Sequence, residues 1–447
     1  MHLNLAVAAL SLLTQATVSL PSSPDRDPGR VPGPYDFRDA TTLLEAELPK
    51  LSGNVAVLVR QNGREIYRFQ RGTIDFDTQT RMASLTKSLS SGVILGAVED
   101  GLLTLDERVG DAYPLLFPRP GIGDATVLDC WAMRHGIDAP LAYEHLPFFT
   151  HWQSVVQIGT NGFVLFPAGE RLGYDGAGMQ VTGYLAAQRA GLSWEALASQ
   201  RILHPLGMNA TDYLQFTPNP CVPGGARSTA LDVMRFADMI LDEGQFRGQP
   251  ILQPASIERF FTNHTRGLPV EGSPFPAMHP DYPYGVDPDY GFGGWVLAEH
   301  PTSQHVEEIV GAGAWGSFVW MDRRRGLTAA LITDVPAGSQ ASVRASLGLF
   351  TVARAAVEAR QIEGLRAAAS SAGVTLSWTP PAGARSVRVV GSQEPIRDVF
   401  DLRHADVLGT SRSGQLVVPP YPYYAATAAL GSLHNSALIP GVNSIAP

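Results

Sequence analysis

The sequence predicts an α+β fold, in which an antiparallel sheet with strands from both ends of the main domain is flanked by helices. Two short alternating runs come early and are joined by Gln61-Asn62-Gly63, a turn typical of β-hairpins. Three more strand-like runs come late, and mostly helical patterns separate them from the first two. Such strands bury their apolar faces by sharing one sheet under the helices. The five runs are residues 54–60, 64–69, 293–297, 318–321 and 327–333.

The composition bounds the function classes. The chain has 447 residues, of which 45% are hydrophobic and 17% charged, so it can bury a large core. Its net charge of -9 excludes nucleic acid and an anionic membrane surface as primary partners, because both need a basic face. A small-molecule substrate is expected instead. After the N-terminal segment, no stretch approaches the ~18 apolar residues of a membrane span.

The N-terminus predicts export. Residues 1–20 carry an apolar run followed by small and hydroxylated residues, a pattern typical of a secretory signal peptide. Residues 21–36 are rich in proline and charge and are expected to be a linker. We therefore predict a secreted, extracellular protein, or a periplasmic one in a bacterium, whose main domain spans residues 37–355.

The composition changes near the C-terminus. An Ala/Arg-rich stretch predicts a helical linker at 356–371, and short alternating runs with an early tryptophan, Trp378, predict a small β module at 372–435 before a tail at 436–447. The module resembles a fibronectin type III domain, and its expected role is spacing or binding a partner or surface. An irregular extension packed on the main domain is the alternative.

Lysine usage singles out one position. Lysine occurs only at Lys50 and Lys87, so nearly all of the 33 basic residues are arginine. Arginine stays protonated, whereas a lysine amine can be neutralised and can then accept a proton. Lys50 ends a predicted helix and has a surface explanation. Lys87 follows Ser84 by three residues at the start of a helix predicted to run to about residue 100, which places amine and hydroxyl on one face within reach. Ser84 as a plain helix cap is the alternative.

The segment Ala83-Ser84-Leu85-Thr86-Lys87-Ser88 resembles the active-site motif of serine β-lactamases, D-alanyl-D-alanine peptidases and related esterases. The resemblance spans residues 40 to 355 and is closest to the class C-like branch with its carboxylesterases and acyltransferases. It implies the β-lactamase/penicillin-binding-protein-like fold with a helical subdomain, Ser84 as nucleophile and Lys87 as general base. Further matches lie at 101–106, 205–208, 225–232 and 290–295.

The second motif of that family is Tyr-x-Asn, about ninety residues past the serine, and here Tyr174-Asp175-Gly176 stands in its place. The resemblance implies that Tyr174 works with Lys87 as general base and acid, which requires a cation beside the phenol. Gly176 replaces the asparagine, so this substrate-binding position has lost an amide. A core tyrosine at the sheet edge is the alternative interpretation of Tyr174.

The third motif maps to Gly311-Ala312-Gly313-Ala314, close to the Trp-Gly-Gly pattern of the esterases. The resemblance implies that Gly311, Ala312 and Gly313 line the substrate and that the N–H groups of Ser84 and Ala314 form the oxyanion hole. Gly311 stands where relatives carry a cationic or aromatic residue, and the third-motif lysine or nearby hydroxyls of relatives normally hold a substrate carboxylate. Neutral esters are therefore expected in preference to β-lactams. A glycine-rich edge strand is the alternative.

The predicted function is a serine hydrolase that forms a covalent acyl-enzyme on a small ester or amide, with a carboxylesterase as the expected activity. An acyltransferase, a D-Ala-D-Ala peptidase or a β-lactamase of the same fold is the alternative, and a non-catalytic ligand- or partner-binding relative is the alternative of another class. The sequence has no H-E-x-x-H and no C-x-x-C, and neither metal nor cofactor is predicted. Pairing of Cys130 with Cys221 and glycosylation of Asn209 and Asn263 stay open.

Overall fold

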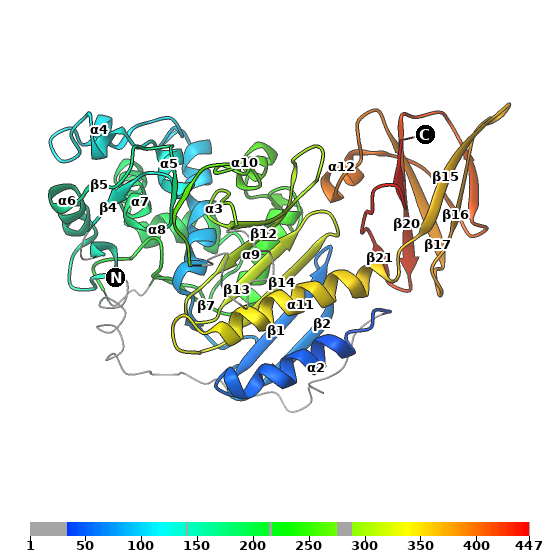
Figure 1. Ribbon diagram of the computed structural model, residues 1–447, viewed down its shortest axis with the longest axis horizontal. Helices are drawn as coiled ribbons and strands as arrows, with labels where there is room; N and C mark the ends of the chain where they lie inside the picture. The colour runs from blue at the N-terminus through cyan, green and yellow to red at the C-terminus, as the bar shows by residue number, and fades with distance from the viewer. Residues whose placement is uncertain (1–33, 140–141, 214–216, 275–287, 447) are drawn as a thin grey trace.

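The computed structural model describes residues 34–139, 142–213, 217–274 and 288–446. A large part with mixed helices and strands is followed by a small part at the C-terminus that is mostly β (Figure 1). The predicted signal peptide and residues 21–33 of the predicted linker lie outside the described residues. None of the described helices is long and apolar enough to cross a membrane.

The large part is built on a six-stranded antiparallel sheet in the order β11-β12-β13-β14-β1-β2. The predicted hairpin is β1 and β2, and Asn62 and Gly63 have the positive φ of 50° and 73° that its turn requires. Strand β1 pairs with β14, which confirms that strands from both ends share one sheet. The strands are β1 Val55–Gln61, β2 Arg64–Arg71, β11 Trp295–Glu299, β12 Val306–Ala312, β13 Phe318–Asp322 and β14 Leu327–Ile332.

Helices cover both faces of this sheet. Helices α2 and α11 pack together on one face, and α9 packs on the opposite face with α3 beside it (Figure 1). Helix α10 lies near the edge of the sheet. The remaining helices of the large part form a lobe beyond α3. The helices are α2 Arg38–Glu47, α3 Thr86–Glu99, α4 Val109–Ala112, α5 Val127–Trp131, α6 His151–Asn161, α7 Ala177–Ala190, α8 Trp194–Ala198, α9 Ala230–Leu241, α10 Pro254–Phe260 and α11 Gln340–Glu358.

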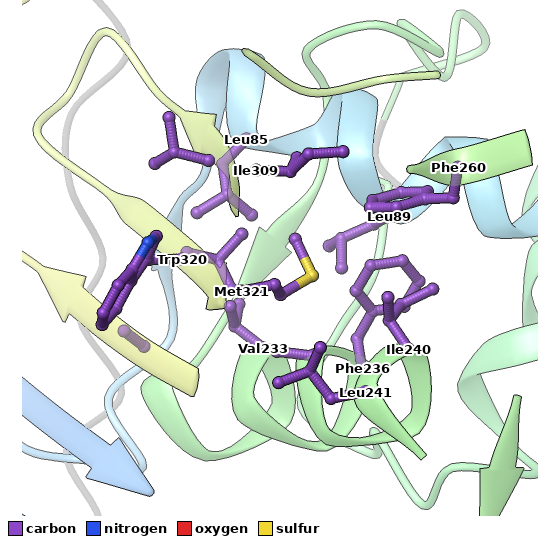
Figure 2. Packing of buried hydrophobic residues seen from close by; sticks show 14 of the residues in the cluster. Leu85, Leu89, Val233, Phe236, Ile240, Leu241, Phe260, Ile309, Trp320 and Met321 are labelled. Carbon is purple, nitrogen blue, oxygen red and sulfur yellow. The ribbon is translucent and has the colours of Figure 1, made fainter. Parts of the chain in front are cut away.

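The core between α3, α9 and the sheet fixes the position of α3. Figure 2 shows Leu89 of α3, Phe236 of α9 and Met321 of β13 meeting in one apolar cluster, and each is fully buried. Burying one such side chain contributes about 1.5–3 kcal/mol. Helix α3 is buried along most of its length, so its first turn is held rigidly against the sheet.

Two antiparallel sheets form the C-terminal part. One has the order β15-β16-β19 and the other β18-β17-β20-β21, with β22 also paired to β20. Near the start of β20, the Tyr424 hydroxyl donates to the carbonyl of Pro419 at 3.0 Å, the tyrosine corner found in immunoglobulin-like sandwiches. The fibronectin type III assignment stays a prediction. The strands are β15 Glu363–Ser370, β16 Gly373–Thr379, β17 Ser386–Ser392, β18 Asp406–Ser411, β19 Gln415–Val418, β20 Tyr423–Leu430, β21 Leu433–Asn435 and β22 Ser444–Ile445.

Three expected boundaries differ from the structure. The helix before the module ends at Glu358, and residues 363–370 form β15, because pairing with β16 overrides the helical propensity of an alanine-rich segment. The expected tail is part of the β fold, since β22 pairs with β20 and Leu438 is buried. At the other end, Tyr35 lies in the core rather than in a linker and donates to Gln61 Oε1 at 2.6 Å.

Buried polar contacts join the two parts. Asn435 of β21 donates to the carbonyls of Val357 and Arg360 at 3.0 and 3.1 Å, and its Oδ1 accepts from Gln61 at 3.1 Å. Asp398 precedes α12, Val399–His404, and its carboxylate lies 2.9 Å from Nε of Arg323 in the β13–β14 turn; both side chains are buried. The C-terminal part is therefore a fixed extension of the large one.

Candidate active site

The predicted nucleophile lies in a short 3₁₀ turn, Ala83–Leu85, that leads directly into α3. Ala83 has φ of +45°, an uncommon conformation for a residue with a side chain. Ser84 is partly exposed, whereas both of its neighbours in the α3 direction are buried. The turn therefore presents the Ser84 hydroxyl at the surface of an otherwise buried helix start.

Lys87 lies within hydrogen-bond reach of this serine. Its Nζ is 3.0 Å from Ser84 Oγ and 3.2 Å from the carbonyl oxygen of Pro223, and the residue is only 4% exposed. The i, i+3 spacing thus places amine and hydroxyl together, as the sequence predicts. A buried amine in contact with a hydroxyl is the arrangement that general-base activation of a serine needs.

Tyr174 follows β6, Leu172–Gly173, and comes next to the same lysine. Lys87 Nζ lies 4.8 Å from the centre of the Tyr174 ring, within the range of a cation–π contact. The ring stacks on Trp295 with centroids 4.8 Å apart and meets the ring of Tyr290 edge-on at 5.9 Å. The structure therefore brings Ser84, Lys87 and Tyr174 together, and it gives the matched segment 290–295 a function in holding Tyr174.

The matched segment 225–232 fixes the serine turn through backbone hydrogen bonds. Strand β7, Arg227–Ser228, pairs with β3, Thr80–Arg81, immediately before the turn. The Met82 N–H donates to the carbonyl of Ala226 at 2.9 Å, and the Ala226 N–H donates to Thr86 Oγ1 at 3.1 Å. Backbone on both sides of Ser84 is thereby tied to one segment.

Gly293 explains why glycine occurs in the segment 290–295. Its φ is +85°, and a Cβ there would lie 1.6 Å from Ser91 Oγ and 2.9 Å from the carbonyl oxygen of Lys87. The Gly293 carbonyl accepts from Ser88 Oγ at 2.8 Å. Only a residue without a side chain lets this loop lie on α3 directly behind the lysine.

The third motif lies at the end of β12, beside the serine turn. A Cβ on Gly313 would meet the carbonyl oxygen of Met82 at 2.1 Å, so this loop contacts the residues that precede Ser84. Ala312 is half-buried and Ala314 is exposed. An oxyanion hole formed by the N–H groups of Ser84 and Ala314 is compatible with this placement and stays a prediction.

Two expected substrate-facing glycines are closed in by protein. A Cβ on Gly311 would lie 2.4 Å from Ser88 Oγ of α3, so the absence of a side chain here lets β12 approach the helix. A Cβ on Gly176 would lie 2.7 Å from Pro223 Cγ and 3.3 Å from Glu144 Oε1. Both residues are buried, so the absence of their side chains lets protein segments pack together at positions that the sequence assigned to substrate binding.

The acidic surroundings of the site were not foreseen. Glu144, in the 3₁₀ turn Tyr143–His145, is 3% exposed and lies beside Gly176. Burial raises the pKa of its carboxyl, while the charge of Lys87 acts in the opposite direction. Burial, with the charge of Glu144 as a second cause, raises the pKa of Asp175 to about 6. The replacement of the motif asparagine by Gly176 was the only sequence signal that something else fills this space.

Other groups with chemical potential lie outside this cluster. Within the described residues, no group of three or more His, Cys, Asp or Glu side chains is arranged to hold a metal ion. Cys130 and Cys221 are both buried and free, which answers the open question of their pairing. Asn263 donates to Asp289 and Glu299 at 2.8 and 3.0 Å, so its amide is already engaged.

Comparison with known proteins gives one family and a set of similar folds. The model of the family described as Beta-lactamase matches residues 44–350. A candidate β-lactamase from Bacteroides dorei DSM 17855 is 22% identical with a TM-score of 0.63, covering 72% of this chain and all of that chain. EstCE1, described as a hydrolase with promiscuous acyltransferase activity, is 18% identical with a TM-score of 0.58, covering 70% and 97%.

A third solved structure extends the likeness past the family segment. The octameric penicillin-binding protein homologue from Pyrococcus abyssi is 16% identical with a TM-score of 0.55, and the match covers 89% of this chain and 95% of that chain. The match therefore takes in strands of the C-terminal part as well. At these identities the likeness is one of fold.

Proposed function

Because this chain belongs to the β-lactamase family, we propose that it is a serine hydrolase that cleaves small neutral esters through a covalent acyl-enzyme on Ser84. The observation that carries the proposal is the 3.0 Å contact between Lys87 Nζ and Ser84 Oγ beneath the ring of Tyr174. These residues supply a nucleophile, its base and a second proton carrier within one cluster.

The reaction follows from these positions. Ser84 Oγ bonds to the carbonyl carbon as its proton moves to Lys87, and the carbonyl oxygen becomes an oxyanion held by the N–H groups of Ser84 and Ala314. Collapse of this intermediate breaks the ester C–O bond, and the departing alkoxide takes a proton from Lys87 through Tyr174. Water then attacks the acyl-enzyme in the same way and releases the acid.

The charges around the site support a neutral substrate. The third motif offers Gly311 in place of a cationic residue, and the buried carboxyls of Glu144 and Asp175 lie on the Tyr174 side. A substrate carboxylate would enter a site with buried acidic groups nearby and no added lysine. An uncharged ester avoids that repulsion.

A hydrolysis panel tests the proposal. We expect turnover of short p-nitrophenyl esters, and negligible turnover of nitrocefin and of a D-alanyl-D-alanine peptide, both of which carry a carboxylate. Ser84→Ala abolishes the ester activity. Nitrocefin turnover above ester turnover would overturn the substrate class, and ester turnover unchanged in Ser84→Ala would overturn the nucleophile.

Acyl transfer is the second candidate. EstCE1 combines hydrolysis with promiscuous acyltransferase activity on a similar fold, and any acyl-enzyme can pass its acyl group to an alcohol. Product analysis of p-nitrophenyl butyrate turnover with added alcohol separates the two, because transfer gives a butyrate ester and hydrolysis gives butyrate.

A further inference from the structure

Glu144 occupies the space that Gly176 leaves beside the reacting lysine. A Cβ on Gly176 would lie 3.3 Å from Glu144 Oε1 and 2.7 Å from Cγ of Pro223. The carbonyl of Pro223 in turn accepts from Lys87 Nζ at 3.2 Å. Glu144, Gly176, Pro223 and Lys87 therefore form one continuous packed group, and a carboxyl stands where relatives have an asparagine.

This carboxyl is buried, and its polar surroundings stabilise it only in part: a backbone hydrogen bond of its own residue favours the charged form. Glu144 is 3% exposed, and its Oε2 has no hydrogen-bond partner among the described residues. Its Oε1 lies 3.6 Å from Nε2 of His145, a longer contact than a hydrogen bond. A buried carboxyl in such a place is costly unless a nearby cation compensates it.

Lys87 is the cation that acts on Glu144. Within the described residues, no carboxylate lies within ion-pair distance of Lys87, although this amine is buried and must carry a positive charge once it accepts a proton. Glu144 and Lys87 attract each other at longer range, across the Pro223–Gly176 contact. Each therefore supplies the charge that the other lacks.

We propose that Glu144 is a positioning residue whose carboxylate stabilises the Lys87 ammonium formed when Lys87 takes the Ser84 proton. The inference rests on the proposed function. In that step the Ser84 O–H bond breaks, a bond from Oγ to the carbonyl carbon forms, and the proton stays on Nζ. The proposal requires Glu144 to carry its charge while Lys87 is protonated, much as the aspartate of a Ser-His-Asp triad stabilises its imidazolium.

The other charges near Glu144 bear on the same equilibrium. Asp138 at the end of β4, Ile137–Asp138, and Asp175 oppose ionisation of Glu144, while Lys87 favours it. His145 adds a titratable neighbour at 3.6 Å. Burial raises the pKa of Glu144, and its own backbone hydrogen bond and then the charge of Lys87 act in the opposite direction.

The test compares Glu144→Gln with wild type in the pH dependence of kcat/KM for p-nitrophenyl acetate. Loss of the carboxylate is expected to lower the plateau of kcat about 10- to 100-fold with little change in KM, because one charge that stabilises the ammonium from beyond ion-pair distance is removed. It is also expected to move the acid limb down by about one pH unit, because the protonated base loses its stabilising neighbour. Glu144→Asp, which keeps a carboxylate, is expected to keep the limb in place.

Glu307→Gln is the matched control, because Glu307 is also 3% exposed and also has an unpartnered oxygen, but pairs with Arg324 at the distant end of β12. It should change thermal stability without moving the acid limb. An acid limb of the pH profile that stays in place in Glu144→Gln would overturn the inference about Glu144. If the glutamine variant does not fold, an acid limb that moves down in Glu144→Asp would overturn it. Absence of ester turnover in wild type would overturn the proposed function instead.

Discussion

The ring of Tyr174 stacks on the indole of Trp295, with centroids 4.8 Å apart and planes inclined by 29°. The two residues are 121 positions apart in the sequence. Lys87 Nζ lies 4.8 Å from the centre of the same Tyr174 ring. The position of the phenol relative to the lysine is therefore set by an aromatic contact that reaches across the site.

Removal of that contact should impair turnover more than binding. In Trp295→Leu the Tyr174 ring loses a stacking partner worth about 0.5–1.5 kcal/mol, so we expect kcat for p-nitrophenyl butyrate to fall about 5- to 10-fold with KM nearly unchanged. Trp295→Phe keeps an aromatic face and should retain most of the activity. Equal kcat values for the leucine and phenylalanine variants would contradict this role.

The two lysines of the chain provide a matched pair. Lys87→Arg places a permanently charged side chain in the site, and we expect kcat/KM to fall by about 10³-fold or more because arginine cannot accept the serine proton. Lys50→Arg changes an exposed residue that pairs with Glu47 at 3.1 Å and should leave the rate unchanged. Steady-state ester hydrolysis measures both, and substantial activity in Lys87→Arg would exclude Lys87 as the base.

Alanine variants of Gly293 and Gly101 distinguish the cost of a steric clash from the cost of backbone strain. Both have positive φ, +85° and +71°, but a Cβ on Gly293 would strike Ser91 whereas a Cβ on Gly101 would meet nothing within 4 Å. Gly101→Ala is expected to cost about 1–2 kcal/mol from its left-handed backbone. Gly293→Ala should cost more and should also reduce ester hydrolysis, because the loop behind Lys87 must move. Denaturant unfolding and initial rates measure the two effects. Equal losses of stability and of ester hydrolysis in the two variants would contradict the clash between a Cβ at residue 293 and Ser91.

Asp175 should make stability depend on pH. Its pKa is raised from 3.8 to about 6, so the folded state holds this proton more tightly than the unfolded state and loses stability as the pH rises from about 4 to about 6. Asp175→Asn removes this loss and should become more stable relative to wild type by about 1–3 kcal/mol over that range. Its Oδ1 can still accept the Ala177 N–H.

Thermal unfolding at several pH values measures the difference, with the exposed Asp77→Asn as the control for general charge effects. A stability difference between Asp175→Asn and wild type that stays constant from pH 4 to pH 7 would contradict the assignment.

Local patterns in the sequence predicted the parts of the fold that depend on near neighbours. The turn at Asn62-Gly63 defined the hairpin, and the spacing of Ser84 and Lys87 placed both on one face. Strand β15 could not be predicted, because its alanine-rich sequence favours a helix and only the distant partner β16 makes it a strand. The tail was missed for the same reason, since β22 has two residues and depends on β20.

The site likewise combines features that local motifs predict with features that depend on distant segments. The sequence located Ser84, Lys87 and Tyr174 through motifs, yet it could not show that Gly311 backs onto α3 or that Glu144 fills the space beside Gly176. Both facts depend on chain segments that meet only after folding, more than thirty positions apart. The sequence therefore assigned Gly176 and Gly311 to substrate binding, whereas in the structure protein atoms lie against both positions.

The most direct test of the central claim is mass spectrometry of the protein after reaction with a fluorophosphonate. The account predicts one adduct, mapped to Ser84, absent in Ser84→Ala and formed much more slowly in Lys87→Arg. Ser193→Ala, which changes the N-cap of α8, should be labelled like wild type. An adduct on another residue, or labelling of Ser84→Ala at the wild-type rate, would contradict the account.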